Sequence, residues 1–135
     1  MFKLVRLCAA LALAASLAAC GGVSSPSNQT AEDFTGTLGQ SSQAFQTFSV
    51  SRTGELSMTL QSLTPRPVVG FVSLGIGTPG AGSCSPLLGY IISQAAIGTP
   101  YSFPRIINGT YCIVVADANA ILTGPTNFAI RFTHP

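Results

Sequence analysis

The chain has 135 residues, 7% of which are charged, and a formal net charge of +2. Lys3 and Arg6 account for that excess. The remaining charged side chains balance: Arg52, Arg66, Arg105 and Arg131 against Glu32, Asp33, Glu55 and Asp117. Without Lys3 and Arg6 the rest of the chain is neutral, which excludes electrostatic recruitment of that part by nucleic acid or by anionic lipid.

The first 19 residues have the three parts of an export signal. Lys3 and Arg6 form a positive N-terminal region, and residues 7–19 form an apolar run that only Ser16 interrupts. That run is shorter than the roughly 20 apolar residues that a transmembrane helix needs. We therefore expect a signal peptide over residues 1–19.

The apolar run ends in Leu17-Ala18-Ala19-Cys20, which resembles the lipobox of bacterial lipoproteins processed by signal peptidase II. The resemblance implies cleavage before Cys20 and attachment of acyl chains, palmitate among them, to that residue. Two or more such chains give stable anchoring, at about 0.8 kcal/mol per buried CH₂. The residue after the cysteine is Gly21, whereas an Asp at that position signals retention in the inner membrane. The outer membrane is therefore the expected location in the cell envelope. The alternative is an ordinary A-x-A signal followed by a chance cysteine.

The rest of the chain divides into a tether and one domain. Residues 20–33 include a stretch rich in Gly, Ser, Pro and Asn that lacks periodicity, which predicts a flexible tether. Residues 34–135 are enough for one domain that folds alone.

The apolar residues of this domain alternate with period two, which is the pattern of β-strands. Residues 111–115 are more continuously apolar, as expected of a central strand buried on both faces. Residues 90–97 fit neither a helical nor a strand pattern. The sequence predicts an all-β fold, a small antiparallel β-sandwich of the jelly-roll kind. Its expected strands, from clearest to weakest, are residues 55–61, 128–133, 111–115, 45–50, 68–76 and 36–38.

Two cysteines remain after the expected processing, Cys84 and Cys112. An even pair in an exported protein predicts a disulfide. Residues 75–86 are rich in Gly, Pro and Ser and contain Cys84, so we expect a long loop that the disulfide pins to the sheet. Binding sites often lie on loops held in this way. The G-x-G-x-x-G match at residues 75–80 precedes no helical pattern, so we interpret it as part of this loop.

The strand pattern also resembles the bacterial pre-peptidase C-terminal domain. The resemblance rests on Phe48-Ser49-Val50, on residues 54–60, on residues 109–115 and on Phe128-Ala129-Ile130. It implies a small jelly-roll-like sandwich without catalytic residues. Residues 68–71 depart from the family, which usually has an Asp-led strand there, and this weakens any inherited calcium site.

No residue set in the sequence predicts catalysis. A Ser-His-Asp arrangement would need His134 as its base and Asp117 as its acid, but His134 lies next to a terminus, where chains fray. Asp117 and Asn119 are weak candidates for a Ca²⁺ site, since two side chains are too few ligands and each can instead bond its own turn. The sequence gives no reason to expect a cofactor.

Our leading hypothesis is a non-enzymatic, lipid-anchored envelope protein whose sandwich contacts another protein or a polymer. The alternative is a carbohydrate- or peptidoglycan-binding accessory module. Exposed tyrosines lining a groove would favour that alternative, and the candidates are Tyr90, Tyr101 and Tyr111.

Substitution of Cys20 by Ser tests the lipid anchor. Because the thioether needs the cysteine sulfur, we expect Cys20→Ser to move the protein from the membrane fraction to the soluble fraction. Intact-mass spectrometry of the wild-type protein should show acyl mass on a chain that begins at Cys20. A mature wild-type chain without acyl mass would contradict the prediction.

Overall fold

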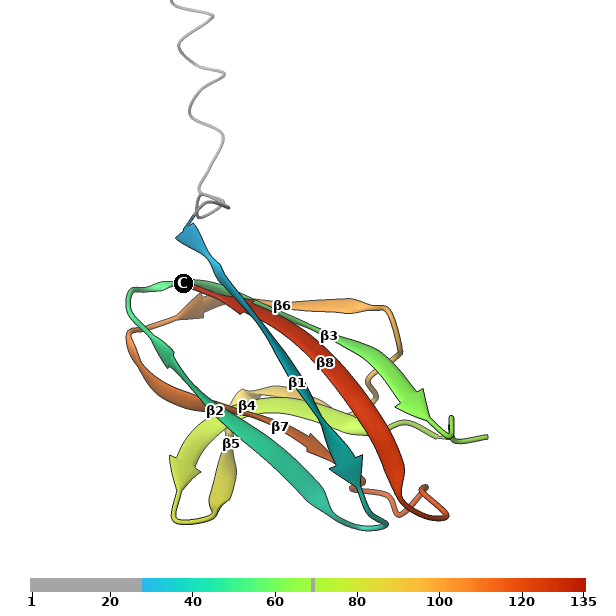
Figure 1. The fold of residues 1–135 in the computed structure, drawn as a ribbon. Coiled ribbons are helices and arrows are strands. Elements are labelled where there is room, and N and C mark those ends of the chain that lie inside the picture. Colours follow the sequence, from blue (N-terminus) through green and yellow to red (C-terminus); the bar gives the residue numbers. More distant parts are fainter. Residues whose placement is uncertain (1–27, 69) are drawn as a thin grey trace, which may run out of the picture.

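The computed structural model describes residues 28–68 and 70–135, which form eight β-strands (Figure 1). The predicted signal peptide over residues 1–19 and residues 20–27 of the predicted tether, which include Cys20, lie outside the described residues. Within the described part, no helix is long and apolar enough to span a membrane. The strands are β1 (Thr30–Leu38), β2 (Gln43–Val50), β3 (Gly54–Thr64), β4 (Ser73–Gly80), β5 (Ser83–Ile92), β6 (Pro100–Ile106), β7 (Gly109–Ala116) and β8 (Thr126–His134).

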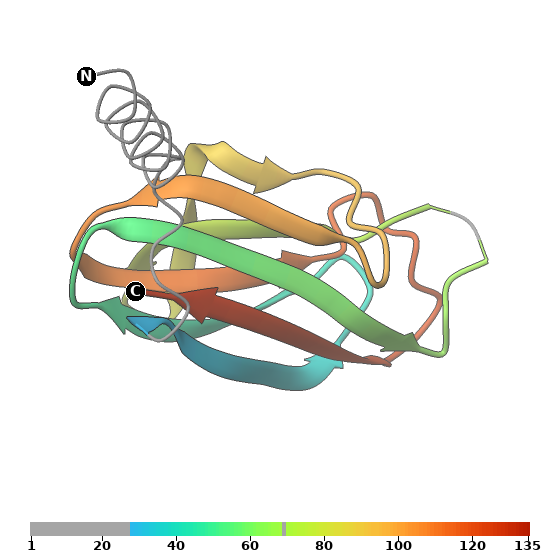
Figure 2. The same ribbon diagram turned by 90° about the horizontal axis from the view of Figure 1, so that it is seen from above.

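The strands form two four-stranded antiparallel sheets that pack face to face (Figures 1 and 2). One sheet has the order β1-β8-β3-β6 and the other has the order β2-β7-β4-β5. The predicted all-β sandwich is therefore confirmed. Strand β1 begins at Thr30, so residues 30–33, which the sequence assigned to the tether, are part of the first sheet.

The core lies between the sheets and follows the predicted alternation. Leu56, Met58 and Leu60 of β3 are fully buried, and the polar residues between them point outward. The inward rows of β8, β4 and β7 complete the same apolar cluster, whose members include Phe128, Ile130, Phe132, Leu74, Ile76, Ile113 and Val115.

Strand β7 is buried on both faces, as its continuous apolar sequence predicted. Ile113 and Val115 point into the core, whereas Cys112 and Val114 form a second, small cluster with Cys84 and Phe45. Since side chains alternate along a strand, this cluster covers the outer face of β7.

The prediction of a long loop at residues 75–86 is wrong. This segment forms most of a hairpin in which β4 and β5 pair on either side of a turn at Ala81-Gly82. Glycine and proline favour loops, but glycine inside a strand also marks a close approach of another backbone. At Gly77 a Cβ atom would lie 2.4 Å from the carbonyl oxygen of Ser85, so β5 can cross close to β4 only because this residue has no side chain.

Three further strands differ most from expectation. The strand expected at residues 68–76 begins at Ser73, and the strand expected at residues 36–38 extends over Thr30–Leu38. Strand β6 was not predicted, because Pro100 and Pro104 interrupt its pattern. It is an edge strand, where proline is tolerated because half of the backbone groups need no sheet partner.

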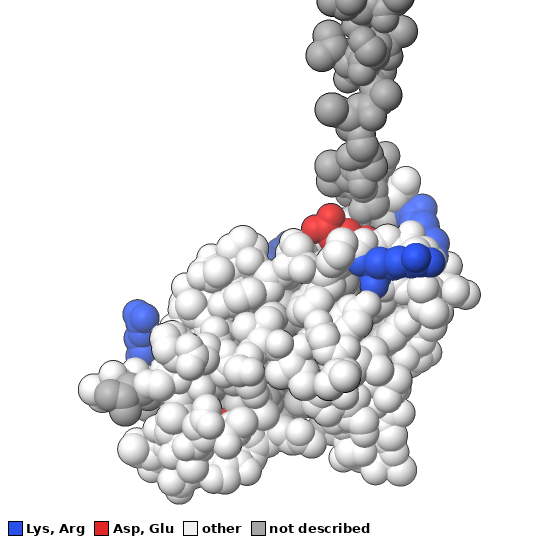
Figure 3. Space-filling view, turned by 180° about the vertical axis from the view of Figure 1, so that it is seen from behind, with Lys and Arg blue, Asp and Glu red and all other residues white. Residues whose placement is uncertain are grey.

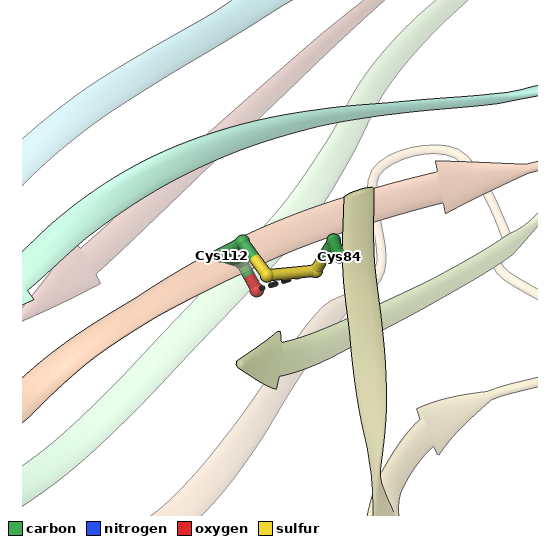
Figure 4. Close-up of a disulfide and its surroundings, with 2 residues drawn as sticks. All are labelled: Cys84 and Cys112. Atoms are coloured by element: carbon green, nitrogen blue, oxygen red, sulfur yellow. Dashed lines mark hydrogen bonds between the residues drawn. A yellow bond between two sulfur atoms is a disulfide. The ribbon is translucent and has the colours of Figure 1, made fainter. Parts of the chain in front are cut away.

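The predicted disulfide joins Cys84 of β5 to Cys112 of β7, although β4 lies between these strands (Figure 4). Their Cα atoms are 6.0 Å apart. The bridge passes over β4 at Gly77, which pairs with Cys112, and a Cβ atom on Gly77 would lie 2.8 Å from the Cys84 sulfur.

Substitution of Gly77 by Ala tests this crossing. The added methyl group would overlap the Ser85 backbone and the disulfide, so we expect Gly77→Ala to lower the free energy of unfolding by about 2 kcal/mol. The control is Gly124→Ala, where a Cβ atom meets nothing within 4 Å. Urea unfolding of the oxidised proteins measures both, and equal stabilities of the two variants would contradict the prediction.

Candidate functional site at the distal end of the sandwich

The two ends of the sandwich differ, and we name them by the course of the chain. The proximal end holds the start of β1 and the end of β8, where Thr30 pairs with His134. The distal end holds the end of β1 and the start of β8, where Leu38 pairs with Thr126. Eight residue steps separate them, which is about 27 Å along a strand.

Asp117 organises the distal end. Its carboxylate accepts backbone N–H bonds from Ser41 at 3.0 Å, Ile121 at 2.8 Å and Leu122 at 3.2 Å. These bonds tie the β1–β2 connection to the β7–β8 connection. Burial alone would raise the pKa of Asp117, but the three backbone donors lower it, and the net shift is downward from the usual value.

The same geometry gives Asp117 a structural role and not that of a metal ligand. N–H groups point at both of its oxygens, Asn119 is exposed, and no group of three His, Cys, Asp or Glu residues suited to a metal occurs in the described residues. The sequence left two roles open for Asp117, a Ca²⁺ ligand or an acceptor of hydrogen bonds from its own turn. The structure favours the second role.

His134 belongs to the opposite end and is not frayed, contrary to the sequence-based expectation. The side chain is buried, and Nε2 lies 2.9 Å from Oε1 of Glu32. The rings of Phe48 and Phe132 lie at 5.0 and 5.8 Å from the imidazole. Because Asp117 lies at the distal end, it cannot share a catalytic site with His134.

The charged side chains are also distributed unequally. Figure 3 shows most of them near the end where the described chain begins, and one basic side chain apart from the rest. At the distal end of the described structure, Arg66 is the single exposed charge, because Asp117 is only 2% exposed. Arg66 makes no ion pair with any described residue, whereas Arg131 pairs with Asp33 at 3.2 Å.

Arg66 lies in the β3–β4 connection, which extends beyond the sandwich (Figures 1 and 2). Val68 in this connection is 99% exposed and Phe71 is 44% exposed. We call Arg66, Pro67, Val68 and Phe71 the distal ridge. Shallow hollows of about 270 and 260 Å³ flank it on either side. The ridge residues Arg66, Pro67 and Val68 line both of them.

The base of the ridge is fixed although its tip is exposed. Val72 is fully buried and its carbonyl accepts the N–H of Ala95 at 2.9 Å. Gly70 has a φ of +82°, and a Cβ atom there would lie 2.7 Å from Ile121. The connection can therefore lie against the β7–β8 connection only because residue 70 is glycine.

Sequence reasoning missed the ridge. It assigned Val68 to a strand and placed the binding loop at residues 75–86, which form part of the β4–β5 hairpin. The available signal was an arginine between Pro65 and Pro67 followed by apolar residues, a combination that suits neither a regular strand nor a buried core.

The tyrosines have different roles. The hydroxyl of Tyr101 accepts the N–H of Ala96 at 2.8 Å, so this residue supports a loop. Tyr90 donates to the carbonyl of Arg105 at 2.7 Å. Tyr90 and Tyr111 together line a third hollow, at the opening between β5 and β6.

Substitution of Asp117 by Asn tests its role at the distal end. An amide accepts through one oxygen only, so at least one buried N–H loses its partner, and we expect a loss of about 2 kcal/mol in the free energy of unfolding at pH 7. Because the folded-state pKa is lowered, the stabilisation is present above the unfolded pKa, near 4, and is lost as pH falls through the folded value.

The difference between wild type and Asp117→Asn should therefore shrink in acid, as measured by urea unfolding from pH 7 to pH 2.5. The control is Asp33→Asn, which breaks an exposed ion pair of little value. A pH-independent difference would contradict the assigned role.

No family model matches the chain, and no curated protein is similar to it in sequence. The lipobox and the resemblance to the pre-peptidase C-terminal domain therefore stay predictions. Among solved structures, the fold is similar to that of PliG from Aeromonas hydrophila, described as a periplasmic lysozyme inhibitor of g-type lysozyme. The TM-score is 0.53, and the match covers 83% of this chain and 91% of that chain at 10% identity. At this identity the likeness shows a shared fold.

Proposed function

We propose that this chain is a non-enzymatic binding protein of the bacterial cell envelope and that the distal ridge is its contact surface for a protein partner. One observation carries the proposal. The distal end exposes Val68 and Phe71 beside Arg66, which has no ion-pair partner among the described residues.

The chemistry of the ridge favours a protein over a small ligand. Interface centres are rich in aromatic residues and arginine, and a few such side chains supply most of the binding energy. Each flanking hollow is smaller than the roughly 300 Å³ at which ligand pockets begin. A convex ridge therefore fits a concave partner, into which Val68 and Phe71 bring apolar area.

The fixed base of the ridge also supports binding. The bond between Ala95 and Val72 and the close approach of Gly70 to Ile121 hold the base of the connection, at Gly70 and Val72, in place before any partner arrives. A pre-positioned surface loses less conformational freedom on association, and more of the contact energy appears as affinity.

The distribution of acid–base groups supports a non-enzymatic role. Asp117 is the one acidic residue described at the distal end, and backbone donors occupy its oxygens. His134 lies about 27 Å away by strand geometry. The anchor expected at Cys20 would join the proximal end, so the ridge would face away from the membrane.

The solved neighbour suggests a partner class. PliG is named as an inhibitor of a g-type lysozyme. Enzymes that cleave glycosidic bonds flank the bond with two carboxylic acids, and an arginine can pair with a carboxylate through two parallel hydrogen bonds. A peptidoglycan-cleaving glycosidase is thus the partner that we propose for Arg66 and the ridge.

Binding of the processed chain to a g-type lysozyme tests this proposal. We expect a complex by calorimetry and a slower clearing of a peptidoglycan suspension. Arg66→Ala and Val68→Ser should each weaken binding about 30-fold, the effect of losing a contact worth about 2 kcal/mol.

The matched control is Arg105→Ala, since Arg105 is also exposed and unpaired among the described residues but lies at the proximal end. It should bind the lysozyme as the wild type does. Absence of binding to the lysozyme would reject this partner, and wild-type affinity in both ridge variants would reject the ridge as the contact surface.

A further inference from the structure

Strand β5 contains a wide bulge on the open side of the sandwich, by which we mean the side formed by the edge strands β5 and β6 of the two sheets. Gly75 of β4 pairs with Ile91, but Gly77 pairs with Pro86. Residues 87–90 of β5 thus lie opposite Ile76 alone. Gly89 in this bulge has a φ of +83°, and Leu88 beside it is 96% exposed. A bulge redirects side chains that a regular strand would place elsewhere.

Tyr90, in the bulge, reaches the edge of the other sheet. Tyr90 stacks on Phe103 of β6, with ring centroids 5.2 Å apart and planes at 21°. Its hydroxyl donates to the carbonyl of Arg105 at 2.7 Å. These two contacts fix the Tyr90 ring and join the edge strands of the two sheets.

A hollow of about 340 Å³ opens at this junction. It is larger than either hollow beside the distal ridge. Its surface is mostly aliphatic and aromatic, and it is lined by Leu87, Tyr90, Arg105, Ile106, Ile107 and Tyr111.

Two polar groups of the hollow are not used by the fold. The Arg105 guanidinium and the Tyr111 hydroxyl have no hydrogen-bond or ion-pair partner among the described residues. The ring of Tyr111 is itself held in place, since it lies 6.0 Å from Phe48 and close over Gly109. The hollow therefore combines an apolar surface with one charged hydrogen-bond donor, the Arg105 guanidinium, and one hydroxyl group, that of Tyr111.

We propose that this hollow binds one N-acetylated amino sugar of a glycan strand. The C–H face of a pyranose ring is apolar and packs on an aromatic ring. The acetamide carbonyl and the ring hydroxyls accept hydrogen bonds from Arg105 and Tyr111. The acetamide methyl group matches the aliphatic surface of Leu87 and Ile107.

Size and charge agree with this ligand class. The hollow is at the lower end of the range for ligand sites, which suits a single sugar ring. An anionic lipid is less suited, because the three acidic residues of the proximal half, Glu32, Asp33 and Glu55, balance the three arginines there and leave no net positive field. The site is separate from the distal ridge and goes beyond the function proposed for it.

Titration of the processed chain with N-acetylated chitotetraose, followed by NMR, tests the proposal. The control ligand is cellotetraose, which has the same linkage and no acetamide. We expect shifts at the methyl groups of Leu87 and Ile107 and an affinity at least tenfold higher for the acetylated sugar. Tyr111→Phe, which keeps the ring, and Arg105→Ala should each weaken binding at least tenfold.

Arg66→Ala is the matched arginine control and should bind the sugar as the wild type does. Thermal unfolding of each variant confirms that it is folded. The proposal fails if the acetylated sugar does not bind, if it binds no better than cellotetraose, or if Tyr111→Phe and Arg105→Ala keep full affinity. Arg105-dependent binding to phosphatidylglycerol vesicles with no sugar binding would likewise overturn it and assign the hollow to lipid. Because the lysozyme assay depends on Arg66 and this assay on Arg105, either proposal can fail without the other.

Discussion

The inward row of β3 is the contact on which the rest of the structure depends. Leu56, Met58 and Leu60 are fully buried, and they lie in the middle of the first sheet and face the second. Burial of such side chains stabilises a fold by about 1.5–3 kcal/mol each. Ion pairing adds little to this, since among the described residues Arg131 and Asp33 form an exposed pair, and Glu32 and His134 form a hydrogen bond. Apolar packing between the sheets therefore supplies most of the stability.

The open side of the sandwich is shaped by one constraint on β4. Gly77 lets the disulfide and β5 pass close over this strand, and the outer face of β7 is covered as a result. After that crossing, β5 bulges before it pairs again at Ile91. The bulge and the prolines of β5 and β6 also interrupt both edges on this side, which protects them from pairing with other chains. The hollow that we assign to a sugar is a product of the same bulge.

The two ends of the molecule have different chemistry because their charges are used differently. At the proximal end the pairs of Glu32 with His134 and of Asp33 with Arg131 join β1 to β8. At the distal end Asp117 bonds to the backbone of two connections, and Arg66 stays exposed. A buried carboxylate thus holds the distal backbone in place, while the ridge on that end keeps an apolar tip and a charge for a partner.

The fold class, the two clearest strands and the disulfide could be predicted from the amino-acid sequence alone. Period-two alternation at residues 55–61 and 128–133 and an even cysteine count are properties of the chain that need no knowledge of pairing. The β4–β5 hairpin, strand β6, the burial of His134 and the distal ridge depend on contacts between distant segments, and they became visible in the folded chain. The glycines and prolines of these segments favour loops locally, and strand pairing overrides that preference. His134 meets Glu32 across 102 positions of the sequence, and such a contact is set by which strands become neighbours. The hollows arise in the same way, since each is lined by segments that only the packing of the two sheets brings together.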